Sequence, residues 1–394
     1  MSPPLRLTIA TPYLPYPQVP HGGGQDLFRL IEALSDRHRI ALVSFVDRAQ
    51  AAHAPDIRPY VEELQLIWPA RHWCQRARRL MAALRHGAWH TLGRRAAGQM
   101  RQAIVGRPAD VLHCAWTEMG RYLEAAPSGA VRVLDEVDVR FLVDQAAGLP
   151  AWHQRRRRRE ELGYCRAADL VLTRSQRDLV ALQQALPDLS GLVLPPAGHQ
   201  SAFGDIAPEE SRPGQVLFVG AMDRARNQAA ARWLVQDIWP LVEQAHPTAR
   251  LRLVGANPPP AVQALARPPA IVVTGWVSDL AREYARARVV VAPMRSEAGA
   301  LNKVLDGLAA GRPVVATGRA NAGIGAPPRA ICLADDAPTL AAAVVGLLRD
   351  ELDWRRIGAA GRAFVQRSFD WPAAVAAYEA ALLARVAPGV RSDG

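Results

Sequence analysis

The sequence predicts an α/β protein made of two Rossmann-like domains, and three observations support this. Short apolar strands alternate with helical segments, the alternation occurs in two series, and a polar stretch from Gly198 to Gly214 separates them. Strands of a parallel sheet are buried on both faces and therefore appear as nearly continuous apolar runs. A chain of 394 residues is also too long for one ordinary hydrophobic core.

Both series consist of segments rich in valine, leucine and isoleucine. The first series is Leu5–Thr11, Arg39–Phe45, Leu64–Trp68, Asp110–Ala115, Val131–Asp135 and Asp169–Thr173, with helical segments such as Gln25–Arg37 between them. The second is Val216–Gly220, Leu251–Gly255, Ile271–Gly275, Val289–Pro293 and Val314–Thr317. We therefore expect an N-terminal domain over residues 1–197 and a C-terminal domain over residues 198–369. Ligands of such sheets bind outside the carboxyl ends of the strands, which we expect to face a cleft between the domains.

Composition narrows the class of protein. No stretch approaches 18 uncharged apolar residues, and the N-terminus leads into the first strand with no pattern of a secretory signal, so we expect a cytoplasmic protein. The four cysteines are scattered without a CxxC pair, which argues against bound zinc and for reduced thiols. The net charge of +11 favours anionic partners without saying which.

Lys303 is the only lysine, against 47 arginines. It follows the strand Val289–Pro293 and a glycine-containing loop, where a helix is expected to begin near Asn302 or Lys303. A compact ammonium beside the positive end of a helix dipole suits a diphosphate. Asp306 lies three residues on, on the same helical face, where it could accept the hydroxyls of a ribose. The alternative for Asp306 is a first-turn acid that only complements the helix dipole.

Gly22, Gly23 and Gly24 stand between the first strand and the helix expected from Gln25. Glycines let backbone approach a ligand closely, and a following helix offers free N–H groups to an anion. The segment is not GxGxxG, so a dinucleotide site is not supported. A flexible turn after a proline-rich loop is the alternative interpretation.

The C-terminal half contains a series of short motifs, which are Phe218–Asp223 with Asn227, Trp233 and Ile238–Leu241, Leu253–Gly255 with Asn257-Pro258, Val273–Gly275 with Val277 and Asp279, Val291–Arg295, Asn302–Asp306 and Gly311–Ala316. The N-terminal half contains Pro15–Pro17, His21–Gly24 and Leu134–Val139. Through these motifs nearly the whole chain resembles the family 4 retaining glycosyltransferases of the GT-B fold, and it is especially similar to the branch associated with PEP-CTERM/exosortase polysaccharide systems.

The resemblance implies a donor site in the C-terminal domain. Lys303, with Arg295 or Arg224, would hold the diphosphate of a nucleotide sugar, Asp306 would contact the ribose, and the backbone at Trp276 and Val277 would contact the base. Gly299 and Asn302 belong to the donor-binding loop and helix start, Gly22, Gly23 and Gly24 would close over the donor, and Asp138 joins Lys303 and Asp306 as a catalytic residue. The reaction would need no metal and no cofactor, and the segment 370–394 would return to the first domain.

The chain departs from the family pattern at four positions. The ribose-binding glutamate is replaced by Asp306, a basic loop residue by Ala298, an alanine after the acid by Gly307, and a histidine before Asp138 by Val137. Glycine at position 307 should weaken its helix by about 1 kcal/mol. A donor site that has lost catalysis is therefore one alternative.

Two basic regions remain. Residues 68–109 contain nine arginines and no acidic residue, with an apolar repeat at Leu80, Leu84, Ala88 and Leu92. This pattern indicates an interfacial helix on anionic membrane that would make the protein peripheral on the inner face of the cell membrane, or else an ordinary helix with a solvated face. The run Arg155–Arg159 favours a solvated helix surface.

The function we expect is transfer of a sugar from a nucleotide-diphosphate donor to a glycan or lipid-linked acceptor in bacterial surface polysaccharide assembly. The alternatives are a non-catalytic GT-B protein that binds anionic membrane or nucleic acid, and another nucleotide-sugar enzyme such as an epimerase. No specific nucleic-acid module occurs in the sequence. The base, the sugar, the acceptor and the oligomeric state do not follow from these residues.

Overall fold

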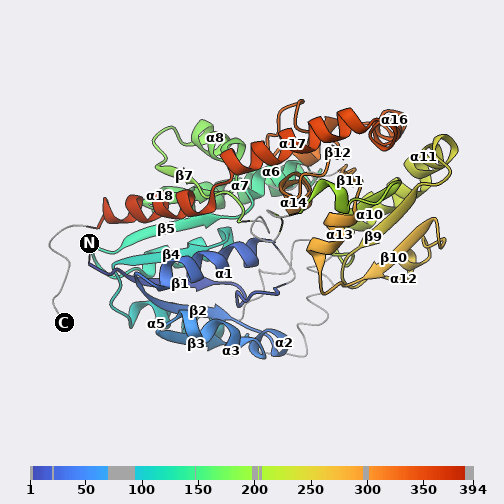
Figure 1. Ribbon diagram of the computed structural model, residues 1–394. Coiled ribbons are helices and arrows are strands. Elements are labelled where there is room, and N and C mark those ends of the chain that lie inside the picture. Colours follow the sequence, from blue (N-terminus) through green and yellow to red (C-terminus); the bar gives the residue numbers. More distant parts are fainter. Residues whose placement is uncertain are drawn as a thin grey trace. The chain divides into compact units, whose positions relative to one another are not determined.

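The computed structural model describes residues 3–19, 22–69, 94–146, 148–197, 203, 206–295 and 301–386. The chain divides into two compact units, Met1–Leu194 with Pro372–Gly394, and Pro195–Trp371. Each unit has its own parallel sheet (Figure 1). The predicted α/β class with two Rossmann-like domains is confirmed, and each unit is described by itself below.

The first unit contains a seven-stranded sheet in the order β3-β2-β1-β4-β5-β6-β7, and every pairing is parallel. Its strands are β1 (Arg6–Thr11), β2 (Arg39–Phe45), β3 (Glu63–Ile67), β4 (Val111–Ala115), β5 (Val131–Glu136), β6 (Leu170–Thr173) and β7 (Gly191–Val193). Its helices are α1 (Gly22–Ser35), α2 (Arg48–Ala51), α3 (Ala54–Ile57), η1 (Arg58–Tyr60), α5 (Arg94–Val105), the 3₁₀ segment η2 (Thr117–Ala125), α6 (Arg140–Ala146), α7 (Ala151–Ala167), α8 (Gln176–Ala185) and α18 (Trp371–Leu383).

Alternate residues of the strands face opposite sides of this sheet. One face carries Ala10, Leu112 and Leu134, which form a core with side chains from α5, η2, α7 and α8. The other face carries His113 and Asp135, and the terminal helix α18 returns to that face, where the Tyr378 hydroxyl lies 2.8 Å from His113 Nδ1 (Figure 1). Helix α18 is therefore part of the first unit's core.

The second unit contains a six-stranded parallel sheet in the order β10-β9-β8-β11-β12-β13. Its strands are β8 (Gln215–Val219), β9 (Arg250–Val254), β10 (Ile271–Gly275), β11 (Val289–Ala292), β12 (Val314–Ala316) and β13 (Cys332–Leu333). Its helices are η3 (Pro208–Glu210), α10 (Ala225–Trp233), the π-helical turn η4 (Leu234–Ile238), α11 (Trp239–Ala245), α12 (Pro260–Gln263), α13 (Leu280–Arg286), α14 (Asn302–Ala309), α15 (Gly318–Asn321), α16 (Ala337–Arg349) and α17 (Glu351–Ser368).

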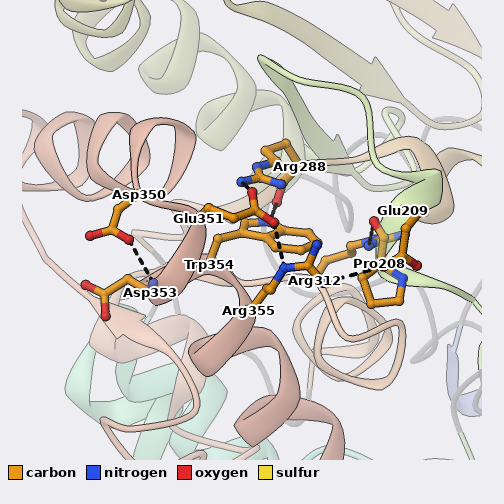
Figure 2. A network of polar contacts seen from close by, with 9 residues as sticks. All are labelled: Pro208, Glu209, Arg288, Arg312, Asp350, Glu351, Asp353, Trp354 and Arg355. Atoms are coloured by element: carbon orange, nitrogen blue, oxygen red, sulfur yellow. Dashed lines mark hydrogen bonds and ion pairs between the residues drawn. The ribbon is translucent and has the colours of Figure 1, made fainter.

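A buried arginine ties the start of this unit to its far end. Arg312 is 1% exposed, and its guanidinium donates to backbone oxygens of η3 and α13, among them Pro208 O at 3.1 Å and Tyr284 O at 3.2 Å. Figure 2 shows it beside Trp354 of α17, whose indole Nε1 donates to Arg288 O at 2.6 Å. Burial lowers the pKa of Arg312 to about 10. This network is a structural support of the sheet.

One expectation about local structure was wrong, and the structure adds a packing role at a second position. Helix α1 begins at Gly22 and not at Gln25, so the three glycines form its first turn. Gly307 does not simply weaken α14, because a Cβ at this position would lie 2.8 Å from Val314 Cγ2 and 3.3 Å from Val290 Cβ. The absent side chain lets α14 lie closely on β11 and β12, which offsets the low helix propensity of glycine.

Candidate functional site

Each sheet has a topological switch point, where successive strands stop being added on one side and start being added on the other. In the second unit this point lies between β8 and β11, because β9 and β10 follow on one side and β12 and β13 on the other. In the first unit it lies between β1 and β4. Ligands of open parallel sheets bind outside the carboxyl ends of the strands at such switch points. The residues that follow β8 and β11 therefore form the candidate ligand-binding site of the second unit.

Lys303 lies at the switch point of the second sheet. It is the second residue of α14, which begins at Asn302 as expected, and it is 8% exposed. Its Nζ donates to Asn227 Oδ1 at 2.8 Å and lies 3.5 Å from the Met294 sulfur. The ammonium also lies 4.5 Å from the centroid of the Phe218 ring. Phe218 belongs to β8 and Met294 follows β11, so both switch-point strands contribute to the lysine's surroundings.

The described groups in direct contact with the Lys303 ammonium are neutral. Its contacts are an amide oxygen, a thioether and an aromatic ring, and within the described ranges it forms no ion pair with a carboxylate. Burial lowers the pKa of Lys303 to about 7, and the positive charge of Arg226 adds to the shift. A buried cation without a compensating carboxylate is costly, and an anionic ligand would remove that cost.

The start of α14 adds a second favourable feature for an anion. The first N–H groups of any helix have no partner within the helix, and here Val304 N already bonds to Leu301 O at 2.9 Å. The N–H groups of Asn302 and Lys303 precede this bond at the positive end of the helix dipole. Asn302 itself is half-buried. Lysine charge and helix start together form a site suited to phosphate.

The predicted arginines lie at the same edge of the sheet and are exposed. Arg295 follows β11, and its guanidinium lies 5.2 Å from the centroid of the Trp233 ring. Arg224 precedes α10, and its Nε lies 3.9 Å from Asp223 Oδ1. A cavity of about 660 Å³ opens beside Met294 and is lined by Met294, Arg295, Thr317, Gly318, Arg319, Ala322 and Asp335. Arg295 thus faces a space large enough for part of a ligand.

The other predicted residues of this unit lie on β10's exit and on α14. Trp276 is 70% exposed and follows β10, which is the edge strand, and Val277 beside it is half-buried. Asp306 is 2% exposed and lies near enough to Tyr284 that its charge, after burial, raises the pKa of that phenol. Gly299 lies outside the described residues. The roles of Asp306, Trp276 and Val277 stay predictions.

In the first unit the glycines lie at the switch point between β1 and β4. A Cβ on Gly23 would lie 2.6 Å from Val137 Cγ1 and 3.2 Å from Trp116 Cζ2. Trp116 follows β4 with a φ of 73°, and its ring packs edge-on against Tyr13 with centroids 4.4 Å apart. Glycine is therefore required at position 23 by close packing. The neighbours Gly22 and Gly24 complete the first turn of α1.

Asp138 is half-buried in the short loop between β5 and α6. The helix that follows it is anchored by Glu161 of α7, whose carboxylate accepts from Arg140 N at 2.6 Å and from Phe141 N at 2.9 Å. Burial raises the pKa of Glu161 to about 7, although these two backbone donors oppose the shift. The start of α6, directly after the loop that carries Asp138, is therefore held in place by Glu161.

Three residues around Lys303 were not predicted as site residues, namely Phe218, Asn227 and Met294. Phe218 and Met294 look like ordinary core positions beside apolar strands. Asn227 had one signal, because it occurs in the motif that opens the second domain, but the motif alone assigns it no partner. Its contact with Lys303 joins positions 76 residues apart.

A comparison with known protein families also gives a match in the second unit. Residues 213–350 match the family model described as glycosyl transferases group 1. No curated protein matches the sequence.

Solved structures match nearly the whole chain. Sucrose-phosphate synthase from Thermosynechococcus elongatus superposes with a TM-score of 0.71 at 18% identity, covering 96% of this chain and 98% of that one. Anabaena Alr3699/HepE in complex with UDP and glucose gives 0.71 at 13% identity, covering 95% and 99%. The trehalose-phosphate synthase (UDP-forming) from Burkholderia vietnamiensis gives 0.65 at 10% identity, covering 96% and 100%.

These likenesses show the fold, and the predicted GT-B fold class is confirmed. Residues 213–350 thus match the glycosyl transferases group 1 model within a chain that has the GT-B fold. The assignment to family 4 and to the PEP-CTERM-associated branch stays a prediction.

Proposed function

We propose that this protein is a retaining, metal-independent glycosyltransferase that moves a sugar from a nucleotide-diphosphate donor to a glycan or lipid-linked acceptor. The observation that carries the proposal is the buried Lys303 ammonium, held at the switch point by neutral groups beside the start of α14. The group 1 domain match and the neighbours solved with UDP or UDP-glucose support a nucleotide-sugar donor.

The chemistry assigned to this site is stabilisation of the leaving diphosphate. As the glycosyl bond breaks, negative charge grows on the phosphate oxygens, and a fixed cation beside helix N–H groups lowers the energy of that state. Lys303 would supply the charge, and the first turn of α14 would supply the N–H donors. Arg295, exposed beside the cavity, would add a second cation. Asp306 and Asp138 are proposed as further catalytic residues at the ribose and on the acceptor side.

The setting we propose is bacterial surface polysaccharide assembly in the cytoplasm. No described helix has the length and apolar character needed to cross a membrane. Contact with anionic membrane through residues 68–109 stays a prediction, because most of that segment lies outside the described residues.

The proposal is tested by donor turnover. Purified protein is incubated with UDP-, GDP- and ADP-sugars, with and without a lipid extract of bacterial membranes, and release of the nucleoside diphosphate is measured. We expect release from one donor that rises when the extract is added, and a product with the anomeric configuration of the donor by NMR. Conversion of the donor sugar without an acceptor would instead indicate an epimerase. Absence of turnover with every donor would contradict the proposal.

A further inference from the structure

Among the residues that the structure describes, Asn227 accepts a hydrogen bond from the Lys303 ammonium, and it is itself 6% exposed. It lies in the first turn of α10, and its Nδ2 donates to Ala221 O at 2.8 Å. Because a backbone carbonyl can only accept, this bond fixes the amide with its oxygen toward Lys303. The arrangement joins the loop after β8 to the start of α14.

The loop is shaped around this amide. A Cβ on Gly220 would lie 2.8 Å from both Cγ and Nδ2 of Asn227, so glycine leaves the space that the side chain occupies. Gly255 of the neighbouring strand end packs directly on Gly220, because a Cβ at position 255 would lie only 1.8 Å from Gly220 O. The carboxyl ends of β8 and β9 therefore leave little freedom to the loop that holds Asn227.

An amide and a carboxylate have nearly the same shape but opposite consequences at this position. Asparagine accepts one hydrogen bond from the ammonium and leaves its positive charge in place. Aspartate would form a buried ion pair with Lys303 and would repel an arriving anion. Arg226, which precedes Asn227 in the sequence, has the opposite effect to an added carboxylate, because its positive charge lowers the pKa of Lys303.

We propose that Asn227 is a positioning residue, which holds the Lys303 ammonium at the switch point while leaving its charge available to the donor diphosphate. This inference rests on the proposed function, since it gives a specific role to a neighbour of the same site. It also explains why Lys303 is surrounded by an amide, a thioether and a ring.

The test compares Asn227→Asp and Asn227→Ala with the unchanged protein. The nucleotide sugar that binds best among UDP-glucose, GDP-mannose and ADP-glucose is titrated into each protein by calorimetry. We expect Asn227→Asp to weaken binding by about 30-fold or more, and Asn227→Ala by about 3- to 10-fold, because a lost hydrogen bond to a charged group costs less than a cancelled charge.

Gln228→Glu is the matched control. Gln228 is the next residue of α10, its Nε2 donates to Met222 O at 2.9 Å, and the substitution adds the same charge without a contact to Lys303. We expect it to change the affinity by no more than about 3-fold. If Gln228→Glu weakens binding as much as Asn227→Asp, the effect is one of general charge and the inference is overturned.

The pH dependence separates positioning from a merely structural role. In the unchanged protein, affinity should fall as the pH rises above about 7 and Lys303 loses its proton. In Asn227→Asp the added carboxylate favours the charged lysine, so the fall should move to higher pH. The other charged groups on the described elements around Lys303 are the same in both proteins, namely Asp223, Arg224, Arg226, Arg295 and Asp306. An unchanged pH profile would overturn the inference.

Lys303→Met distinguishes the two proposals. If it retains nucleotide affinity, the proposed donor site is wrong and the inference falls with it. If Lys303→Met loses affinity while Asn227→Asp binds normally, the donor site stands and only the role of Asn227 is overturned. Circular dichroism and thermal unfolding of each variant without nucleotide show whether the fold is retained.

Discussion

Two buried cations, Arg174 of the first unit and Lys303 of the second, have opposite surroundings. In the first unit, Arg174 is 3% exposed and its Nη2 lies 2.7 Å from Asp135 Oδ2, while its Nε lies 3.9 Å from Asp26 Oδ2. In the second unit, Lys303 meets only neutral groups among the described residues. Carboxylates hold Arg174 in place, as backbone oxygens hold Arg312, whereas the Lys303 ammonium at the switch point has no carboxylate partner among the described residues, an arrangement that suits an anionic ligand.

The first unit's network extends further through the core. Asp135 Oδ2 lies 3.5 Å from His113 Nε2, and His113 Nδ1 lies 2.8 Å from the Tyr378 hydroxyl of α18. Burial alone would raise the pKa of Asp135, but Arg174 and His113 outweigh it and lower that pKa. The carboxylate therefore stays charged and joins three strands to the terminal helix.

The largest expected effect comes from breaking this network. Arg174→Met should reduce the free energy of unfolding by about 3–5 kcal/mol, because Asp135 would be left buried without its partner. The double variant Arg174→Met/Asp135→Asn should recover part of that loss. Urea unfolding of each variant measures both effects. A loss below about 1 kcal/mol for Arg174→Met would show that the pair is not a structural support.

A second prediction concerns the pH dependence of stability that Lys303 brings. Its pKa is about 7 in the folded protein and 10.5 unperturbed, so between these values the unfolded chain binds the additional proton. Stability should therefore rise with pH across this window, with a slope of up to about 1.4 kcal/mol per pH unit. Lys303→Met should remove that contribution. Identical pH profiles for the two proteins would mean that the ammonium is not buried as described.

Glycine substitutions compare the packing at the first unit's switch point with an open helical surface. Gly23→Ala should destabilise by about 1–3 kcal/mol, because its Cβ would overlap Val137 and crowd Trp116. Gly98→Ala in α5 is the control, since a Cβ there has no neighbour within 4 Å. It should stabilise by about 0.5–1 kcal/mol through helix propensity. Thermal unfolding of both variants tests this, and equal effects would contradict the packing argument.

The smallest expected effect is at the terminal helix. Tyr378→Phe removes the hydroxyl that pairs with His113 Nδ1 and should cost about 1–2 kcal/mol. Hydrogen exchange should show faster opening of α18, while nucleotide binding by the second unit should not change. Tyr164→Phe, whose hydroxyl pairs with the half-buried Glu160, provides a comparison and should cost less. An unaltered stability of Tyr378→Phe would exclude a clamping role for this bond.

The strands were the most predictable part of the molecule. Val131–Asp135 was expected where β5 spans Val131–Glu136, and Val289–Pro293 where β11 spans Val289–Ala292. A buried parallel strand is a continuous apolar run, and that signal is local. The missed strands are β7 and β13, with three and two residues, which are too short to show a pattern.

The candidate site was predictable only where its evidence was local. Lys303 could be placed in the first turn of a helix from its own neighbours in the sequence. Its contacts with Asn227 and Phe218 depend on strand order, because β8 and β11 are adjacent in the sheet but distant along the chain. The link between Tyr378 and His113 spans 265 positions and has no sequence signal. The close packing of Gly307 against Val290 and Val314 likewise depends on the folded sheet.

The proposal that Lys303 holds the donor diphosphate is tested most directly by nucleotide binding to the unchanged protein and to Lys303→Met. Binding is followed as thermal shifts with UDP, GDP and ADP and their sugars. A ligand at 100 times its Kd adds about 2.7 kcal/mol to the free energy of unfolding. We expect one nucleotide to raise the unfolding temperature of the unchanged protein by several degrees and to leave that of the variant, which stays folded, unaltered. Equal shifts in both proteins, or no shift with any nucleotide, would contradict it.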